Sequence, residues 1–271
     1  MTAAQTVGTR ESTPASPLAG VDSAPAIVLD RVSKVYGDTT NALHALDKVS
    51  LSVAEGEFVC LLGASGCGKS TLLNIVAGLD RPSAGSVDVG GARTTLMFQE
   101  AALFPWLTAR GNVEIALKLR KVPRAERKPK VDRLLELVNL SGFARKRPHE
   151  LSGGMRQRVA LARALAQEAD ILLMDEPFGA LDAMTRDLLH DELERLWRDT
   201  NLTIVFVTHN VREAVRLGDR VVLLSSRPGR VTAEFPVTIA RPRRIDSAEV
   251  AELAATITDQ LREEVRRHGG T

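Results

Sequence analysis

The sequence predicts an α/β fold with a largely parallel sheet that helices cover on both faces. From residue 151 onward, helical segments alternate with short apolar runs of strand length. Helices are expected up to about residue 167 and at 183–199 and 211–217, and strands at 170–174, 202–207 and 220–225. Strands separated by helices of this length pair in parallel. Another apolar run, at 57–62, leads directly into glycines, which is typical of a buried strand that ends in a tight turn.

Two other parts of the sequence depart from this alternation. Between residues 26 and 63, short β-branched runs are separated by turn residues, which predicts antiparallel strands. Residues 108–149 combine helical periodicity with dense charge and carry no strand signal. We therefore expect an N-terminal antiparallel β subdomain and an inserted α-helical lobe at about 100–165. A helix from 70 to about 79 and short strands near 86–89 and 94–98 complete the core.

The two ends of the chain have different compositions. Residues 1–26 are rich in Ala, Ser, Thr, Pro and Gly and lack the basic start and apolar centre of a signal peptide, so they are predicted to be a disordered tail. The main domain is expected at 27–235. Residues 236–271 form a C-terminal extension with an amphipathic helix, which we expect to pack on its own domain rather than on a partner. Its apolar face would comprise Val250, Leu253, Ile257, Leu261 and Val265.

Composition limits the class of protein. The 271 residues are 44% hydrophobic and 26% charged, with 36 basic and 34 acidic side chains. This near-neutral net charge does not indicate binding to nucleic acid or to an anionic membrane. No apolar run approaches the roughly 20 residues that span a bilayer. The two cysteines, Cys60 and Cys67, suggest neither a disulfide framework nor a metal cluster, and they fit a reducing cytoplasm.

Residues 63–71, GASGCGKST, fit the phosphate-binding pattern G-x-x-x-x-G-K-[ST] between a strand and a helix. The glycines let successive N–H groups face inward, and the helix N-terminus adds positive potential. Lys69 would reach the β- and γ-phosphates of a nucleotide, Ser70 would ligate Mg²⁺, and Thr71 would support the α-phosphate side. A glycine-rich turn without a ligand is the alternative. The predicted nucleotide-binding residues here are Gly63, Ala64, Ser65, Gly66, Cys67, Gly68, Lys69, Ser70 and Thr71.

Polar side chains follow three other predicted strands. Asp175 and Glu176 end the run ILLMDE, and the carboxyl ends of parallel strands meet at the edge where the phosphate loop also opens. Asp175 would hold Mg²⁺ through water, and Glu176 would act as general base toward the attacking water. His209 follows the run at 202–207, within reach of a γ-phosphate. Gln99 follows the strand at 94–98, where it would touch Mg²⁺ or the attacking water.

Residues 151–155, LSGGM, place two adjacent glycines at the start of an amphipathic helix, where glycine lowers helix stability. With the phosphate loop, Gln99, the acidic strand, the segment GALD at 179–182 and His209, this motif resembles the nucleotide-binding subunits of ATP-binding cassette (ABC) transporters. The resemblance covers about residues 27–235. It implies a RecA-like P-loop NTPase core that uses ATP and Mg²⁺. Soluble ABC ATPases outside transport remain an alternative, whereas a P-loop kinase or GTPase does not explain LSGG.

The resemblance also assigns roles to residues outside the phosphate loop. Two chains, identical or related, would stack head to tail. The Ser152 hydroxyl and the N–H groups of Gly153 and Gly154 would then meet the γ-phosphate held by the other chain. Asp182 would belong to the nucleotide site as part of the GALD segment. Tyr36, the only tyrosine, would stack on adenine, although a role in the strand or core competes with this.

Three longer segments, FQEAALFPWLT, DEPFGALDAMTRDLL and VVLLSSRPGRV, look like the ATPases of nitrate, sulfonate and taurine importers. This resemblance implies an ATP-driven translocase subunit, bound peripherally at the cytoplasmic face of the membrane. It would power a separate transmembrane permease that an extracytoplasmic solute-binding protein serves. Exposed Phe104 and Trp106 would receive a helix of the permease, or they would pack inside the lobe. The import of a different small solute remains open.

Two positions depart from the family pattern. Met155 stands where the wider family has glutamine, so it cannot complete a capping box with Ser152. We expect the change to be tolerated because the assigned phosphate contacts use Ser152 and two backbone amides. Asn210 stands where the importer group often has aspartate, and with Glu213 it should still cap the following helix.

Overall fold

The computed structural model describes residues 25–38, 41–179 and 181–268. The predicted disordered tail lies outside these residues apart from its last two, Pro25 and Ala26, which begin the first strand. None of the helices in the described ranges is long and apolar enough to cross a membrane.

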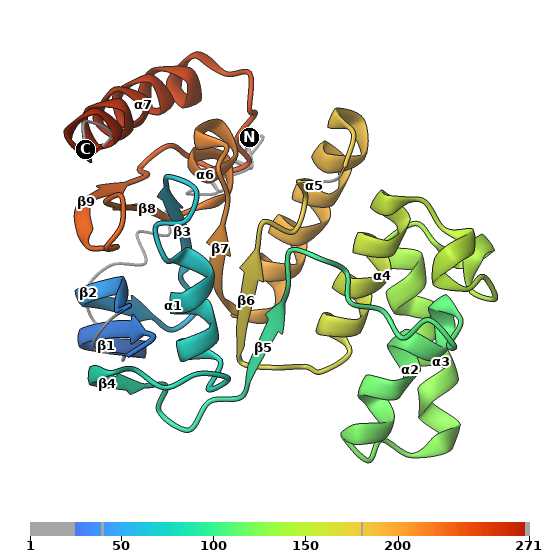
Figure 1. The fold of residues 1–271 in the computed structure, drawn as a ribbon. Helices are drawn as coiled ribbons and strands as arrows, with labels where there is room; N and C mark the ends of the chain where they lie inside the picture. The colour runs from blue at the N-terminus through green and yellow to red at the C-terminus, as the bar shows by residue number, and fades with distance from the viewer. Residues whose placement is uncertain (1–24, 39–40, 180, 269–271) are drawn as a thin grey trace, which may run out of the picture.

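The larger sheet has six strands in the order β5-β6-β7-β3-β8-β9, parallel except for the edge strand β9 (Figure 1). This confirms the predicted parallel sheet. The antiparallel strand β9 was not predicted. Its three apolar residues are only half-buried, so they give a weak hydrophobic pattern in the sequence. The strands are β3 (Phe58–Gly63), β5 (Thr94–Met97), β6 (Ile171–Asp175), β7 (Thr203–Val207), β8 (Arg220–Leu224) and β9 (Val231–Pro236).

The smaller sheet confirms the predicted N-terminal β subdomain. It has the order β2-β1-β4, and β1 pairs antiparallel with both neighbours. Its third strand comes from beyond the phosphate loop, so the subdomain is completed by a segment distant in sequence. The elements are β1 (Pro25–Tyr36), β2 (Leu43–Ala54) and β4 (Ala84–Asp88), with α1 (Lys69–Val76) between this sheet and the larger one (Figure 1).

Helices alone form the lobe on the other side of the large sheet, as predicted (Figure 1). Asn112 is fully buried there, and its side chain accepts from the Phe104 N–H at 2.8 Å and donates to the Thr108 carbonyl at 3.1 Å. These bonds fix the loop that leads into the lobe. The helices are α2 (Ala109–Leu119), α3 (Arg124–Leu137) and α4 (Gly153–Leu165).

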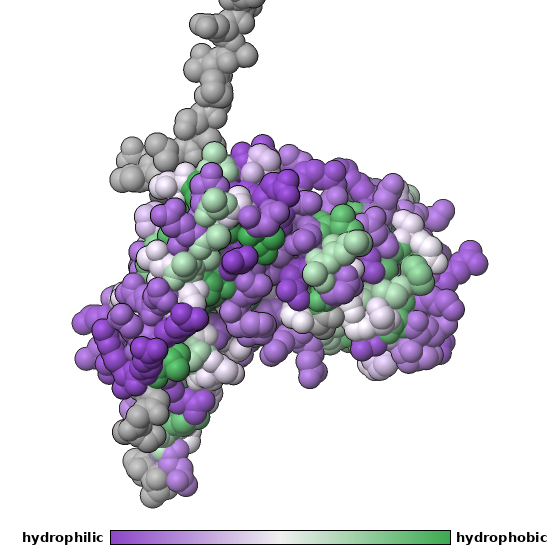
Figure 2. Space-filling view, turned by 90° about the horizontal axis from the view of Figure 1, so that it is seen from above, coloured by the Kyte–Doolittle hydropathy of each residue, from purple (hydrophilic) through white to green (hydrophobic). Residues whose placement is uncertain are grey.

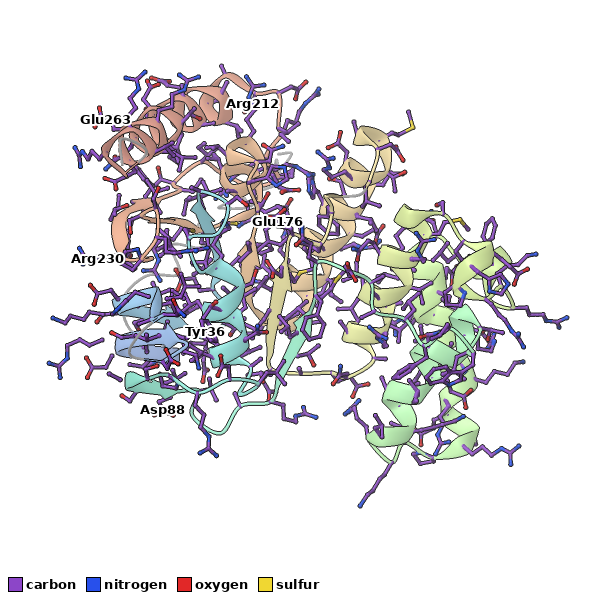
Figure 3. All side chains as sticks on the ribbon, in the orientation of Figure 1. Tyr36, Asp88, Glu176, Arg212, Arg230 and Glu263 are labelled. Carbon is purple, nitrogen blue, oxygen red and sulfur yellow. The ribbon has the colours of Figure 1, made fainter. Side chains whose placement is uncertain are left out.

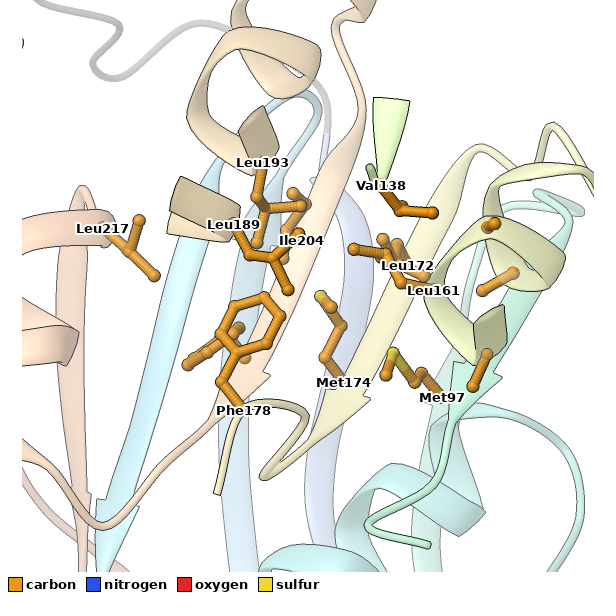
Figure 4. Packing of buried hydrophobic residues seen from close by; sticks show 14 of the residues in the cluster. Met97, Val138, Leu161, Leu172, Met174, Phe178, Leu189, Leu193, Ile204 and Leu217 are labelled. Atoms are coloured by element: carbon orange, nitrogen blue, oxygen red, sulfur yellow. The ribbon is translucent and has the colours of Figure 1, made fainter. Parts of the chain in front are cut away.

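Two hydrophobic clusters lie on opposite faces of the large sheet, and β3 shows how one strand serves both. Val59 and Leu61 point into the cluster shared with α1 and the small sheet. Phe58, Cys60 and Leu62 point into the cluster under α4 and α5 (Ala183–Thr200). Figure 4 shows the second cluster, where Met174 lies between Phe178 and Met97. Side chains alternate along a strand, so a strand buried on both faces is apolar throughout.

The C-terminal helix α7 (Ala248–His268) packs on α6 (Val211–Leu217), as predicted for its own domain. Val250 and Ile257 are fully buried, but Val265 is 45% exposed. The placement of Val265 on the buried face is therefore wrong. Glu264 is 6% exposed, so the buried face continues along α7 past Ile257. Because a turn has 3.6 residues, repeated steps of four residues drift away from that face and bring Val265 toward solvent.

Arg243 fastens this extension to the core. Its buried guanidinium donates to the carbonyl oxygens of Val215 and Gly218 at the end of α6. Burial lowers the pKa of Arg243 to about 10, so the group remains charged at neutral pH. It satisfies carbonyl groups that the helix leaves without partners.

Candidate nucleotide site

The carboxyl ends of four neighbouring strands carry the predicted site residues. The strand order β5-β6-β7-β3 sets the loops that follow these strands side by side along one edge (Figure 1). Gln99 follows β5, Asp175 ends β6 and Glu176 follows it. His209 follows β7, and the loop at 63–71 begins at the last residue of β3. The sheet therefore gathers four predicted groups that are far apart in sequence.

The phosphate loop leads into α1 one residue earlier than predicted, at Lys69. The residue before it, Gly68, has φ 98°, a left-handed conformation that side chains disfavour. Lys69 is 6% exposed, and its ammonium donates to the carbonyl oxygens of Gly63 at 2.8 Å and Ala64 at 3.0 Å. The Cys67 N–H also donates to the Ala64 oxygen, at 3.3 Å. Two donors of the loop thus converge on one oxygen, which suits an anion-binding site.

Asp175 and Ser70 form the oxygen-rich part of the site. Burial raises the pKa of the Asp175 carboxyl, as does the nearby charge of Glu176, whereas a hydrogen bond from Ser70 lowers it. A hydroxyl and a carboxylate side by side are hard oxygen donors, the kind that Mg²⁺ prefers. The residues present therefore fit a magnesium ion.

Glu176 and His209 are in direct contact. The distance from His209 Nδ1 to Glu176 Oε2 is 3.0 Å, and their side chains are 70% and 23% exposed. Glu176 has φ 45°, an uncommon conformation for a residue with a side chain. Its N–H donates to the Val207 carbonyl at 3.0 Å. The carboxylate thus meets the residue that follows Thr208 after β7, and Figure 3 shows Glu176 at the upper end of the large sheet.

A buried network behind His209 was not predicted. The two oxygens of the buried Glu213 carboxylate accept from His190 Nε2, at 2.6 Å, and from the Thr208 hydroxyl. The Thr208 oxygen in turn accepts from the Asn210 N–H at 3.0 Å. The predicted cap is confirmed, because Asn210 Oδ1 accepts from the Glu213 N–H at 3.2 Å. The network holds both neighbours of His209 and joins them to α5.

The segment after β5 is tied to the helical lobe. Gln99 is exposed, and its carbonyl accepts a hydrogen bond from the Gln157 side chain of α4. Arg163, also on α4, donates to the carbonyl oxygens of Ala101 at 3.0 Å and Ala102 at 2.8 Å. Neither Gln157 nor Arg163 was predicted, because both are polar positions on a helix and carry no motif of their own.

The motif at 151–154 begins α4, on the lobe and apart from the phosphate loop (Figure 1). The Ser152 hydroxyl accepts from the Met155 N–H at 3.2 Å and caps the helix. A Cβ placed on Gly153 would come no closer than 3.8 Å to an atom of Arg156. The fold of this single chain therefore does not require glycine at position 153.

Tyr36 and Asp182, the remaining predicted site residues, have partners within the chain. The Tyr36 hydroxyl donates to Asp80 Oδ2 at 2.8 Å, and the Lys34 ammonium lies 4.8 Å from its ring. Tyr36 is the last residue of β1 in the small sheet (Figure 3) and is 38% exposed. Asp182 caps α5, accepting from the Thr185 N–H at 2.9 Å and from its hydroxyl at 2.7 Å.

Phe104 and Trp106 are exposed by 36% and 67%, and their ring centroids are 5.5 Å apart. Trp106 thus does not pack inside the lobe. Seen from above, the surface is mostly hydrophilic, with hydrophobic residues exposed both on the lobe side and on the opposite side (Figure 2).

Comparison with known proteins identifies the family of this chain. Residues 46–179 match the model of the ABC transporter family. The chain is 46% identical to the aliphatic sulfonates import ATP-binding protein SsuB 1 of Mesorhizobium japonicum, over 92% of this chain and 93% of that protein. It is 44% identical to the nitrate import ATP-binding protein NrtD of Synechocystis, over 77% of this chain and 81% of that protein.

A solved structure supports the fold as well. It is the dimeric structure of a post-hydrolysis state of an ATP-binding cassette, bound to ADP and Pi. The two structures align with a TM-score of 0.73 and 35% identity, covering 79% of this chain and all of that one. The residues that match the family model, 46–179, include the 63–71 loop, the acidic strand β6 and most of the helical lobe. This chain belongs to the ATP-binding subunits of the ABC transporter family and is an ATPase.

Proposed function

We propose that the chain powers the import of a small solute, an anion such as nitrate, an alkyl sulfonate or taurine, through a separate membrane permease. The identity to the sulfonate and nitrate import subunits, which extends over most of each chain, carries this proposal. The chain would bind the permease at the cytoplasmic face of the membrane, and an extracytoplasmic solute-binding protein would deliver the solute. Phe104 and Trp106, exposed on the lobe, would contact the permease.

Uptake measurements test this proposal. Cells lacking the gene would be supplied with labelled nitrate, ethanesulfonate or taurine, and then with a copy encoding the wild type or Glu176→Gln. We expect uptake of one of the three to be lost and restored by the wild type alone. Unchanged uptake of all three solutes would contradict the proposed solute class.

For ATP hydrolysis we propose roles for the residues at the carboxyl edge. A water oxygen attacks the γ-phosphorus as the bond to the bridging oxygen of ADP breaks, and Glu176 takes the proton from that water. Lys69 donates to the β- and γ-phosphates, His209 contacts the γ-phosphate, and Tyr36 stacks on adenine. Bound Mg²⁺, held by Ser70 and Gln99 and by Asp175 through water, would neutralise phosphate charge.

We further propose that two chains share each ATP. Ser152 is exposed and Gly153 has open space around it, which suits the close approach of a phosphate bound by the other chain. The free N–H groups at the start of α4 supply positive potential there. Asp182 would lie near the same interface. ATP then binds the closed pair more tightly than the open one, so it can drive closure.

The signature motif gives a prediction of its own. Ser152→Ala should lower ATP turnover about 10- to 100-fold, because a hydrogen bond to a charged phosphate is lost. Met155→Gln should change turnover little, since methionine contributes no phosphate contact. Steady-state ATPase assays at saturating ATP would compare the two variants.

Loss of the helix cap must be separated from loss of the phosphate contact. Thr108→Ala is the matched control, because the Thr108 hydroxyl caps α2 by accepting from the Gly111 N–H at 3.1 Å. It should destabilise the lobe by about 1 kcal/mol, as Ser152→Ala does, and leave turnover nearly intact. A larger effect of Met155→Gln than of Ser152→Ala would contradict the assignment.

A further inference from the structure

The turn between β8 and β9, residues 225–230, touches the outer side of the phosphate loop. Arg227 Nε donates to the Gly66 carbonyl oxygen at 3.1 Å, although 161 positions separate the two residues. At Gly229 the approach is closer still, since a Cβ there would lie 2.2 Å from the Cys67 carbonyl oxygen. Only glycine fits at 229 without displacing the loop. Two consecutive carbonyl groups of the phosphate loop therefore face this turn.

The 225–230 turn is itself firmly anchored. The buried Ser225 hydroxyl donates to the Pro228 carbonyl at 2.8 Å and accepts from the Arg230 N–H at 2.9 Å. Gly229 donates to the Ala45 carbonyl at 2.9 Å, and its own carbonyl accepts from the Asp47 N–H at 3.0 Å. The turn thus joins β2, in the small sheet, to the loop after β3.

The geometry of the peptide group connects Arg227 to the inner side of the loop. In a trans peptide the C=O of one residue and the N–H of the next point in opposite directions. With the Gly66 carbonyl held outward by Arg227, the Cys67 N–H points inward, where it donates to the same Ala64 oxygen as Lys69. Gly66 has φ 76° and no side chain to restrict it, so its peptide could rotate more freely without this bond.

We propose that Arg227 is a positioning residue for the phosphates of the bound nucleotide. Through its bond to the Gly66 carbonyl, it keeps the Cys67 N–H directed at those phosphates. This rests on the proposed assignment of residues 63–71 as the phosphate loop. The side chain does not touch the reacting atoms. Its loss therefore weakens the binding of ADP and ATP and leaves the rate of the chemical step at saturating ATP unchanged.

Calorimetric titration with MgADP tests the proposal, because ADP carries the relevant phosphates and is not turned over. We expect Arg227→Ala to weaken MgADP binding about two- to tenfold, the effect of one hydrogen bond. The KM for ATP should rise by a similar factor while kcat and the unfolding midpoint stay at the wild-type values. Arg227→Lys, which keeps the charge but not the planar guanidinium, should recover part of the affinity.

Two further variants make the outcomes distinct. Arg230 belongs to the same turn but pairs with Asp47 at 2.6 Å and is 61% exposed, so Arg230→Ala should leave MgADP affinity unchanged. Lys69→Ala tests the loop itself, and retained affinity in that variant would refute the phosphate-loop assignment. If Lys69→Ala loses affinity while Arg227→Ala binds MgADP as the wild type does, the loop assignment stands and the role of Arg227 is refuted. The role of Arg227 would also be refuted if Arg227→Ala lowered kcat and the unfolding midpoint while its affinity for MgADP stayed unchanged.

Discussion

Glu176→Gln should lower ATP turnover by about 10²- to 10⁴-fold, the range associated with loss of a general base. Glutamine keeps the size of the side chain but cannot take a proton from the attacking water. His209 Nδ1, 3.0 Å from the carboxylate, can still donate to the amide oxygen, so the geometry of the edge should persist. Steady-state phosphate release measures the loss.

The same variant should accumulate a dimer in the presence of ATP. If ATP closes two chains over the shared nucleotide and hydrolysis releases them, slow hydrolysis leaves the closed form populated. Size-exclusion chromatography with light scattering would show a dimer with MgATP and a smaller species with MgADP. Glu136→Gln on the exposed side of α3 is the control and should behave as the wild type. Full turnover in Glu176→Gln would rule out its role as the base.

Lys69→Ala should weaken MgATP binding about 10- to 100-fold, since hydrogen bonds to charged groups contribute about 1.5–3 kcal/mol. Turnover at saturating ATP should fall as well, because Lys69 is proposed to stabilise charge on the transferred phosphoryl group. Titration with a non-hydrolysable ATP analogue measures the first effect, and ATPase assays measure the second.

Removal of this side chain also removes contacts inside the 63–71 loop itself. The Gly63 and Ala64 carbonyls lose the ammonium that they share at 2.8 and 3.0 Å, so thermal unfolding must be followed in parallel. Lys128→Ala, an exposed lysine of α3, controls for the loss of one positive charge. Unchanged nucleotide affinity in a folded Lys69→Ala variant would contradict the proposed phosphate contact.

Elements defined by local patterns were predictable. The alternation of apolar runs and helical segments after residue 150 is a property of the sequence that burial enforces, and β6, α5, β7, α6 and β8 begin and end close to the predicted positions. The phosphate-loop pattern and the residues that end β6 and β7 also follow from local sequence, because the carboxyl ends of parallel strands share an edge. What could not be predicted there was the contact between His209 and Glu176.

Contacts between segments that are distant in the chain could not be predicted from the sequence. The bond from Gln157 to the Gln99 carbonyl joins residues 58 positions apart, and the bond from Arg227 to the Gly66 carbonyl joins residues 161 apart. His190 and Glu213 are a polar pair on α5 and α6 whose burial no periodicity revealed. These polar side chains each bond to a backbone group or to a single residue far away in the chain. Such a bond leaves no recognisable pattern in the sequence.

The sequence by itself determined the parallel sheet, the helical lobe and the glycine-rich turn between β3 and α1. Hydrophobic periodicity and glycine placement are local requirements of strands, helices and turns. Only the tertiary structure decided how the 63–71 loop is supported. The 225–230 turn reaches the outer carbonyls of the loop because β8 lies beside β3 in the sheet, and strand order is set by packing of the whole core. The helical lobe is likewise joined to the segment after β5 by Gln157 and Arg163, contacts that exist only once α4 has docked.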